Sequence, residues 1–387
     1  MSANIADLSL QYGRVMAERN AKRLAGMDPG ALPAYLTYDA VNRIHPRSLD
    51  LKVASITSVT DTMKTFRLVL NDPSDYLAPF VAGQYLSVHA DINGVHTSRP
   101  ISISSSPLER GYYEITVKRK PDAFLSDYFL DEVKVGDRIT TSGPAGRFNM
   151  NPPVQGDHYV FLAGGSGITP FLSMIREVTD AALPFHIHLI YGCRNLADVP
   201  YLEELKKRSE SSEYFRFDLV LSEPEEGWQG LTGFIGAQLI EKLNIDTKKN
   251  VFFICGPGAM YNFTIPELKK LGIPGRKIRK EIFGAPADIT KEPGWPETIT
   301  KEDVFTLRFE GKEYPCKATE TILTAFERAG IHHPSECRAG ECSLCRIKLV
   351  AGDVFQTSTA LVRKSDVKLG YIHPCVTYPL SDIEVTK

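Results

Sequence analysis

Residues 336–346 read ECRAGECSLCR, and this short stretch carries three of the seven cysteines in a chain of 387 residues. The three, Cys337, Cys342 and Cys345, follow the spacing C-x4-C-x2-C. A fourth, Cys375, comes thirty residues later in the stretch YIHPCVTYP. An odd number of cysteines does not fit a disulfide framework, and three thiols within nine residues indicate a metal site in a reducing compartment.

The spacing of these cysteines is typical of a plant-type [2Fe–2S] cluster, in which each iron takes two thiolates. Gly340 permits the tight turn between the first two ligands, so that backbone N–H groups point at the sulfurs. Arg338 and Arg346 could offset the negative charge of the cluster. Zinc is an alternative, but structural zinc sites usually take their cysteines in two close pairs, and Cys375 stands alone. Structural cysteines without a metal are a further alternative.

The hydrophobic patterning changes along the chain and predicts five segments. Residues 1–48 form an N-terminal extension that is partly helical. Residues 49–152 alternate apolar and polar positions between turn residues, which predicts an antiparallel β-barrel. Residues 153–287 alternate short apolar runs with helical stretches, the pattern of an α/β domain with a parallel sheet. Residues 288–301 are polar and Pro-rich, as in a linker, and residues 302–387 combine a hairpin, a helix and the cysteine loop.

Composition excludes several classes of protein. The formal net charge is −2, and hydrophobic residues make up 43% of the chain. A nearly neutral chain lacks the basic surface that nucleic-acid binding requires. The sequence has no long apolar run for membrane insertion and no apolar leader, so we expect a cytoplasmic protein. Residues 1–48 would either pack on the next domain as a surface helix or dock a partner.

A glycine-rich stretch in the α/β segment predicts a nucleotide site. Residues 160–175 read VFLAGGSGITPFLSMI, which places Gly164, Gly165 and Gly167 between an apolar strand and a helix. Glycines let the backbone approach a diphosphate, which then lies at the N-terminus of the helix. The stretch CGPGAM begins at Cys255, at the predicted carboxyl end of another strand, where open α/β sheets bind their ligands.

Together these motifs resemble the ferredoxin–NADP reductase superfamily, in its oxygenase-reductase type with a C-terminal plant-type ferredoxin domain. The resemblance covers residues 49–287 and 302–387 and leaves residues 1–48 out. It implies a flavin in the barrel, NAD(P)H on the α/β domain, and an α+β ferredoxin-like (β-grasp) fold around the cluster. Members with this domain order use either FAD or FMN, and we expect FAD.

The resemblance assigns the flavin site to residues of the barrel. The family motif Arg-x-Tyr-Ser corresponds to the stretch Arg99, Pro100, Ile101 and Ser102. Ile101 stands in place of the tyrosine that stacks on the flavin ring, which puts the ring packing in doubt. Arg99 would pair with a flavin phosphate, which suits a guanidinium group, and Ser102 would hydrogen-bond near flavin N5. The remaining matches, expected near the flavin phosphates, are Val117, Lys118, Arg119 and Ser126.

The same resemblance assigns the nicotinamide site. Cys255 would lie against nicotinamide C4 and help to position the hydride, and Glu281 would lie near both rings. The alternatives are a small core residue for Cys255 and a surface ion pair for Glu281. Glu223 stands where NADP-dependent members tend to carry a cation, so its charge would repel a 2′-phosphate and favour NADH. Arg194 is the nearby cation that could restore NADPH binding. The remaining expected contacts are Thr169, Gly256, Pro257 and Met260.

The activity implied by the resemblance is electron transfer from NAD(P)H to a protein acceptor such as an oxygenase. Hydride would pass to the flavin, and single electrons would then pass through the cluster to the acceptor, with the protein positioning the cofactors. One alternative is an electron-wiring subunit of a larger complex, although in that type the fourth cysteine lies closer to the others than Cys375 does. Another alternative is reverse flow, from reduced ferredoxin to NAD.

Overall fold

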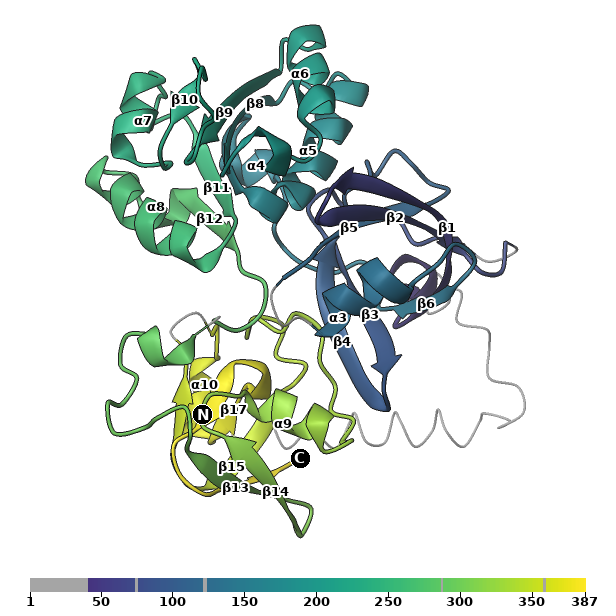
Figure 1. The fold of residues 1–387 in the computed structure, drawn as a ribbon, viewed down its shortest axis with the longest axis vertical. Coiled ribbons are helices and arrows are strands. Elements are labelled where there is room, and N and C mark those ends of the chain that lie inside the picture. Colours follow the sequence, from purple (N-terminus) through teal and green to yellow (C-terminus); the bar gives the residue numbers. More distant parts are fainter. Residues whose placement is uncertain (1–40, 74–75, 121–123, 287, 358–359) are drawn as a thin grey trace, which may run out of the picture. The chain divides into compact units, whose positions relative to one another are not determined.

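The computed structural model describes residues 41–73, 76–120, 124–286, 288–357 and 360–387. The chain divides into two units, residues 1–44 and 45–387, and the second unit holds all the elements described below. The helix predicted near the N-terminus lies outside the described residues. Within the second unit three modules follow one another along the chain, drawn from purple through teal to yellow in Figure 1. No helix in the described part of the chain is long and apolar enough to cross a membrane.

The first module is an antiparallel barrel, as its alternating sequence predicts. Its strands are β1 (Leu49–Thr60), β2 (Met63–Leu70), β3 (Tyr85–Ile92), β4 (Val95–Ser102), β5 (Tyr113–Lys118) and β6 (Arg138–Thr141), and a short helix α3 (Phe124–Asp127) follows β5. The sheet order is β4-β3-β6-β1-β2-β5, and an antiparallel bridge between Ile103 and Ile115 joins its two outer strands. Alternate residues point inward, so that Leu51, Val53 and Phe66 are fully buried in the barrel core.

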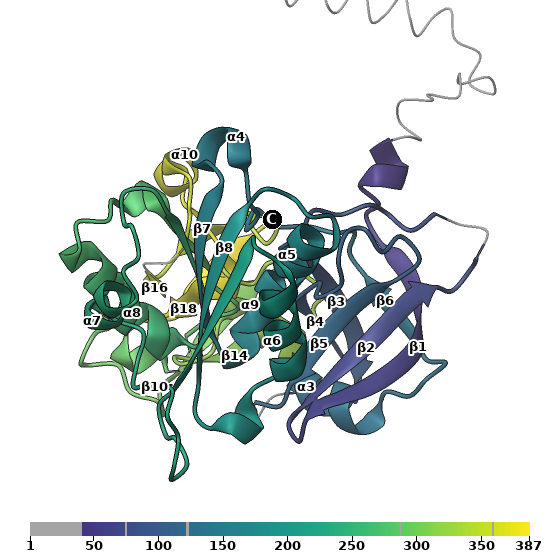
Figure 2. The same cartoon turned by 90° about the horizontal axis from the view of Figure 1, so that it is seen from above.

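The second module is an α/β domain with a parallel six-stranded sheet. Its strands are β7 (His158–Gly164), β8 (His186–Cys193), β9 (Phe215–Leu221), β10 (Leu231–Thr232), β11 (Val251–Cys255) and β12 (Ile278–Glu281). Its helices are α4 (Pro152–Gln155), α5 (Ile168–Asp180), α6 (Leu202–Ser211), α7 (Ala237–Lys242) and α8 (Gly258–Lys270). Helices α5 and α6 cover one face of the sheet, and α7 and α8 cover the other (Figure 2). Two separate apolar cores lie beneath these helices.

The strand order of this sheet creates a switch point. The order is β10-β9-β8-β7-β11-β12, so the chain moves from β7 to β8 on one side and later returns to β11 on the other. Open α/β sheets bind ligands at the carboxyl ends of the strands where this reversal occurs. The two motifs that the sequence singles out follow β7 and β11, one at the end of each strand.

The third module is a small α+β domain that carries the cysteine loop. Its strands are β13 (Val304–Phe309), β14 (Lys312–Lys317), β15 (Ile347–Ala351), β16 (Val354–Gln356), β17 (Tyr371–Ile372), β18 (Thr377–Pro379) and β19 (Ile383–Thr386), and its helices are α9 (Ile322–Arg328) and α10 (Lys364–Lys368). Five strands form one mixed sheet in the order β14-β13-β19-β15-β17. The helix α9 begins at Thr321, whose hydroxyl accepts the N–H of Thr324 over 3.1 Å. Its apolar side packs on this sheet, as in a β-grasp fold.

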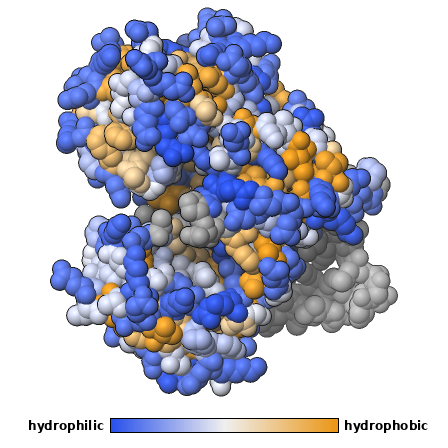
Figure 3. Space-filling view, viewed as in Figure 1, coloured by the Kyte–Doolittle hydropathy of each residue, from blue (hydrophilic) through white to orange (hydrophobic). Residues whose placement is uncertain are grey.

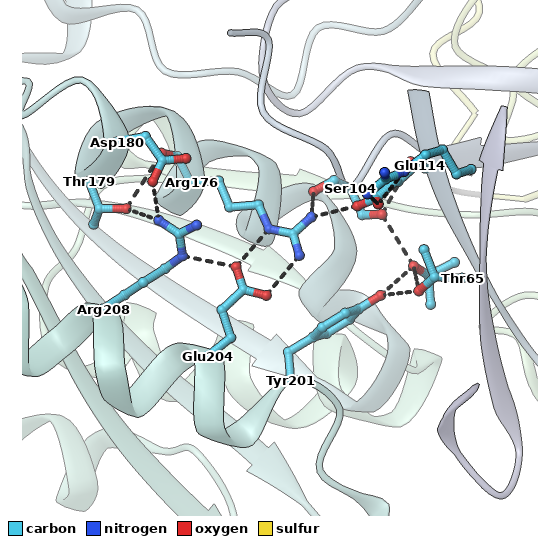
Figure 4. Close-up of polar contacts among 11 residues, drawn as sticks. Thr65, Ser104, Glu114, Arg176, Thr179, Asp180, Tyr201, Glu204 and Arg208 are labelled. Carbon is cyan, nitrogen blue, oxygen red and sulfur yellow. Dashed lines mark hydrogen bonds and ion pairs between the residues drawn. The ribbon is translucent and has the colours of Figure 1, made fainter. Parts of the chain in front are cut away.

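A buried polar network joins the barrel to the α/β domain (Figure 4). Arg176 on α5 donates to Glu114 of the barrel over 2.9 Å and to Glu204 on α6 over 2.7 Å. The hydroxyl of Tyr201 lies 2.6 Å from that of Thr65 on β2. Burial alone would lower the pKa of Arg176, but the two carboxylates overcome this effect and raise it. The guanidinium is therefore a fixed charge that links both domains.

Candidate functional site

The four cysteines of the signature come together as two pairs of thiols. Sγ of Cys345 lies 3.4 Å from Sγ of Cys375. In the other pair, the backbone N–H of Cys342 donates to Sγ of Cys337 over 3.3 Å, and the N–H of Ala339 does so over 3.4 Å. No three metal-binding side chains of the described residues converge as they would around a single ion. Two pairs match the need of two irons that take two thiolates each.

In each pair, one thiol favours the thiolate form that binds iron. The hydrogen bond with the Cys342 thiol, together with backbone N–H groups of the loop, holds the pKa of Cys337 below its usual range. The contact between the Cys345 and Cys375 thiols lowers the pKa of Cys345, and the pKa values of Cys342 and Cys375 are raised. Thiolates, not thiols, bind metals, so these residues fit the cluster that their spacing predicts.

The backbone conformation of the cysteine loop explains why a glycine stands at its turn. Gly340 has φ +75°, and an added Cβ would lie 2.8 Å from Cγ2 of Val376. The glycine that the sequence singles out is therefore required both by conformation and by space. Arg338 and Ser343 also have positive φ, at 50° and 60°. Such conformations are uncommon outside glycine, and the sequence gives no signal for them at these two positions.

The two arginines of the loop are paired with carboxylates. The buried side chain of Arg338 forms an ion pair with Glu327 on α9. Arg346 lies 3.2 Å from Asp366 on α10. Part of the charge that these arginines could direct at a cluster is therefore balanced inside the protein.

The two glycine motifs of the α/β domain touch each other at the switch point. A Cβ on Gly167 would lie 2.1 Å from the carbonyl oxygen of Cys255. A Cβ on Gly164 would lie 2.8 Å from Sδ of Met260 and 2.9 Å from Cδ of Pro257. Because only glycine fits at either position, both loops leave bare backbone at the strand ends, where a diphosphate could approach. The predicted residues Gly165 and Gly256 lie in the same two loops, and Thr169 lies in the first turn of α5.

Cys255 and Glu281 end two neighbouring strands. They are register partners on β11 and β12, and their exposed fractions are 1% and 7%. Burial raises the pKa of the Cys255 thiol and of the Glu281 carboxyl group, and the charges of Glu341 and Cys337 raise the latter further. Glu281 is therefore a buried carboxyl group close to the cysteine loop and does not form the surface ion pair considered as an alternative.

Tyr261 holds this corner together, although the sequence did not indicate it. Its hydroxyl accepts the backbone N–H of Gly256 over 3.1 Å and donates to the backbone carbonyl of Glu281. It therefore links the loop after β11 to the end of β12. The residue directly follows the CGPGAM motif, but only the folded chain shows where its side chain points.

Two cations of the barrel, Arg99 and Lys120, lie close enough for their charges to interact. Burial lowers the pKa of Arg99 to about 10, with a further contribution from the charge of Arg338. Burial and the charge of Arg99 lower the pKa of Lys120, although its side chain keeps access to solvent. Among the described residues Lys120 has no ion-pair partner, and the one carboxylate near Arg99 is Glu327, at 3.9 Å. Such weakly compensated cations fit the phosphates of a flavin. The sequence motif did not include Lys120.

The other residues predicted for the flavin site occupy varied positions. Nζ of Lys118 would lie 3.7 Å from a Cβ on Gly165, so it faces the glycine loop. Arg119 instead forms ion pairs with Asp127 at 2.8 Å and Asp131 at 2.5 Å. The side chain that the resemblance assigns to a flavin phosphate is therefore already paired with two carboxylates. The remaining predicted residues are half-buried (Pro100, Ile101 and Ser126) or buried (Ser102 and Val117).

The first thiol pair meets the barrel directly. Cys337 and Ala339 form one apolar cluster with Tyr85 and Ala145, two residues of the barrel module. Burial raises the pKa of Tyr85, and the charges of the cysteine loop raise it further. The thiol of Cys337 therefore lies at the boundary between the cluster module and the flavin module.

The end of β9 carries the residues expected to choose between NADH and NADPH. The backbone N–H of Glu223 donates to the carbonyl of Arg194 over 2.8 Å. The guanidinium of Arg194 is engaged by Asp198, with Nη2 and Oδ2 2.8 Å apart. Glu223 is exposed. The acidic residue is therefore free to face a ribose, whereas the cation that could bind a 2′-phosphate is already paired.

Three family models match consecutive parts of the chain. An oxidoreductase FAD-binding domain matches residues 50–150, an oxidoreductase NAD-binding domain matches residues 161–265, and a 2Fe-2S iron-sulfur cluster binding domain matches residues 305–380. Each match falls on one module of the fold. The order of cofactors along the chain is thus flavin, nicotinamide and cluster.

Several known proteins are similar to this chain over most of their length. The glycine betaine monooxygenase reductase subunit of Chromohalobacter salexigens is 27% identical, with 87% of this chain and 94% of that protein covered. The NADH oxidoreductase HCR of Escherichia coli is 28% identical, with 86% and 96% covered. Among solved structures, phthalate dioxygenase reductase is 26% identical with a TM-score of 0.65, covering 88% of this chain and 97% of that one.

The three modules and their motifs define an NAD(P)H-dependent flavin and iron–sulfur oxidoreductase. The chain belongs to the ferredoxin–NADP reductase superfamily, in the oxygenase-reductase type with a C-terminal plant-type [2Fe–2S] domain. Its cofactors are FAD, NADH and a [2Fe–2S] cluster. It passes hydride from the nicotinamide to the flavin and single electrons through the cluster to a partner redox protein.

Proposed function

We propose that this reductase delivers electrons from NADH to an oxygenase component, through a junction at which three sites meet. The observation that carries the proposal is the position of Cys337. Its side chain packs on Tyr85 of the barrel, and its charge acts on Glu281 at the end of β12. The cluster loop, the flavin barrel and the nicotinamide edge of the sheet therefore share one corner of the molecule.

Four cysteines would hold the cluster in two pairs, Cys337 with Cys342 and Cys345 with Cys375. The paired thiols and the N–H groups directed at Cys337 support this assignment. The cluster would be reached from the barrel side, because Cys337 is the ligand that packs against Tyr85 and Ala145.

Barrel residues would hold the flavin phosphates and ring. Arg99 and Lys120 would supply positive charge, since their charges are weakly compensated, and Lys118 would add to it beside the glycine loop. Ser102 would hydrogen-bond the ring near N5. Arg119, which the resemblance also assigns to the flavin site, would not contact a phosphate directly while it stays paired with Asp127 and Asp131. When bound, the flavin supplies the conversion of a two-electron hydride transfer into single-electron steps.

The α/β domain would place the nicotinamide at the switch point. The bare backbone after β7 would receive the diphosphate at the start of α5. Cys255 would lie against the reacting edge of the nicotinamide, and the Glu281 carboxyl group, whose pKa is raised by burial, would lie beside it. Tyr261 would position both residues through its hydroxyl group.

The class of the acceptor is proposed from the relatives. The glycine betaine relative and a 3-ketosteroid-9-alpha-monooxygenase reductase component of Mycobacterium tuberculosis are both reductase parts of monooxygenases. Both match this chain over most of their length. The domain boundaries 49–152, 153–287 and 302–387 and a cytoplasmic location complete the proposal. A reducing compartment suits the seven free thiols.

The Cys375→Ala variant tests the proposed path. It should lose the visible and EPR signals of the cluster and most of its cytochrome c reduction, while NADH still bleaches the flavin and ferricyanide is still reduced. The matched control is Cys316→Ala, which removes a fully buried thiol of the same module from outside the signature. This control should keep the cluster and both activities. Equal loss of ferricyanide and cytochrome c reduction in Cys375→Ala would contradict the proposed order of transfer.

A further inference from the structure

A small basic and apolar surface lies beside the second thiol pair. It consists of Leu361, of Arg363 directly before α10, and of the exposed helix residues Lys364, Val367 and Lys368, and is called the α10 patch. Leu361 and Val367 each have 62% of their surface exposed. The three residues within the helix follow the spacing i, i+3, i+4, which places them on one side of it.

The α10 patch adjoins the cluster site next to the second thiol pair. Ala360 packs against the apolar group that contains Cys345 and Cys375. The backbone N–H of the next residue, Leu361, donates to the carbonyl of Gly340 in the cysteine loop over 3.1 Å. Cys337, in contrast, is the ligand that meets the barrel. Electrons can therefore enter beside one thiol pair and leave beside the other.

The charge of the α10 patch is not balanced within the protein. Arg363, Lys364 and Lys368 form no ion pair among the residues that the structure describes. The acidic residue of the helix, Asp366, is buried and paired with Arg346, so it does not offset them at the surface. The face of the molecule drawn in Figure 3 is mostly hydrophilic, with hydrophobic residues in groups among hydrophilic ones. A surface with an apolar centre and uncompensated cations fits a protein partner of opposite charge.

We propose that the electron acceptor docks on the α10 patch, and that its own docking surface is acidic around an apolar centre. This inference rests on the proposed function, because it assumes that the cluster is the last carrier before the acceptor. Opposite charges would raise the rate of encounter and orient the acceptor over the second thiol pair. The contact of Leu361 and Val367 with the partner would then exclude water next to the cluster.

The test compares two acceptors of opposite charge in the FAD- and cluster-loaded enzyme with NADH as donor. Cytochrome b5 is acidic and cytochrome c is basic, and each NADH oxidised reduces two haems and releases one proton. In the variant Lys364→Glu/Lys368→Glu, kcat/KM for cytochrome b5 should fall about tenfold and that for cytochrome c should rise. Both changes should shrink as salt is added. Rates that persist in Cys375→Ala are subtracted, because they bypass the cluster.

The matched control is Lys312→Glu/Lys317→Glu, which makes the same change in charge on β14 of the same module. Both cytochrome rates should stay within about twofold of the wild type, since the charges on α10, and not the net charge of the protein, govern the encounter with the acceptor. The variant Val367→Ser should raise KM for cytochrome b5 without changing its dependence on salt. Flavin bleaching by NADH and the EPR signal of the reduced cluster should match the wild type in all of these variants.

These readouts separate the two proposals. Failure of NADH to reduce the cluster in the wild type would overturn the proposed function itself. Normal reduction of the cluster with equal effects of the two charge reversals would overturn only the docking surface. Binding of the wild type to phosphatidylglycerol vesicles, lost in Lys364→Glu/Lys368→Glu while both cytochrome rates stay unchanged, would assign the patch to a membrane surface instead and would overturn the proposal.

Discussion

Glu281 shows how a single buried side chain can make the protein sensitive to pH. Burial raises its pKa, and the Glu341 carboxylate and Cys337 add to this effect. As the pH rises above the ordinary glutamate value, the unfolded chain ionises at this position while the folded chain stays protonated. The folded state therefore loses stability with rising pH, by about 1.4 kcal/mol per unit, until its own pKa is reached.

The variant Glu281→Gln should remove this loss. Its melting temperature should exceed that of the wild type by a margin that grows between pH 5 and pH 8. The control Glu223→Gln changes an exposed carboxylate and should show no such trend. Thermal melts at several pH values measure the margin. A margin independent of pH would show that the Glu281 carboxyl group ionises normally in the folded protein.

At the scale of residues, the sequence predicted the cysteine and glycine motifs because they are local, and their spacing along the chain limits their geometry. Lys120 and Tyr261 were not predicted, because their positions depend on contacts between separate elements. Arg119 was predicted as a flavin contact because it follows β5, and in the structure it pairs with Asp127 and Asp131. Strand register alone does not determine which carboxylates compete for a surface arginine.

Among the structural elements, the loops after β7 and β11 constrain each other through a close backbone contact. A Cβ on Gly167 would lie 2.1 Å from a backbone oxygen of Cys255, and backbone cannot yield as a side chain can. The variant Gly167→Ala should therefore push the loops apart, at about 1–3 kcal/mol, and weaken NADH binding about tenfold or more. FAD content and the cluster spectrum should persist. Titration of the enzyme with NADH measures the effect.

Gly258 provides the matched control for this prediction. It lies at the start of α8 in the same motif, and an added Cβ there would meet no atom within 4 Å. The variant Gly258→Ala should bind NADH almost as the wild type does. Similar weakening in both variants would mean that the loops respond to any added methyl group and not to the close approach at Gly167.

The loop after β9 should determine the preference for NADH. Glu223 is exposed there, and Arg194 is held by Asp198. In Glu223→Arg, the ratio of kcat/KM for NADH to that for NADPH should fall about tenfold, because a repulsive charge becomes attractive toward a 2′-phosphate. The control Glu225→Arg makes the same change two residues away and should alter the ratio little. Steady-state rates with NADH and NADPH measure this ratio. An equal change of the ratio in the two variants would indicate a general charge effect.

At the scale of the whole molecule, the Arg176 network sets how the barrel and the α/β domain are joined (Figure 4). The variant Arg176→Met removes the cation shared by Glu114 and Glu204, which keep Arg67 and Arg208, and should cost about 1.5–3 kcal/mol. Thermal unfolding should begin at a lower temperature, and flavin bleaching by NADH should slow. The control Arg216→Met breaks an exposed ion pair with Asp218 and should cost at most about 1 kcal/mol. Equal losses of stability in the two variants would show that the Arg176 network contributes no more than an exposed ion pair.

The sequence predicted the modules of the molecule but not the way they are joined. Strand alternation, βαβ patterning and cysteine spacing each identify a fold within one stretch of chain. Arg176 and Glu114 are 62 positions apart, and no local pattern connects them. The packing of Tyr85 on Cys337 likewise joins the first module to the last. Such contacts follow from tertiary packing, which a single sequence does not display.

The nicotinamide loops and the second thiol pair lie on different modules, and this has a kinetic consequence. The loops belong to the α/β domain, and Cys345 and Cys375 belong to the C-terminal module, so donor and acceptor need not share a surface. The enzyme can then work by a two-site ping-pong scheme, in which NAD+ competes with NADH but is noncompetitive toward the acceptor. Accumulating NAD+ would slow the loading of the flavin without displacing a docked acceptor. The cell could thus adjust the flow of electrons through its nucleotide pool while the reductase and its partner stay assembled.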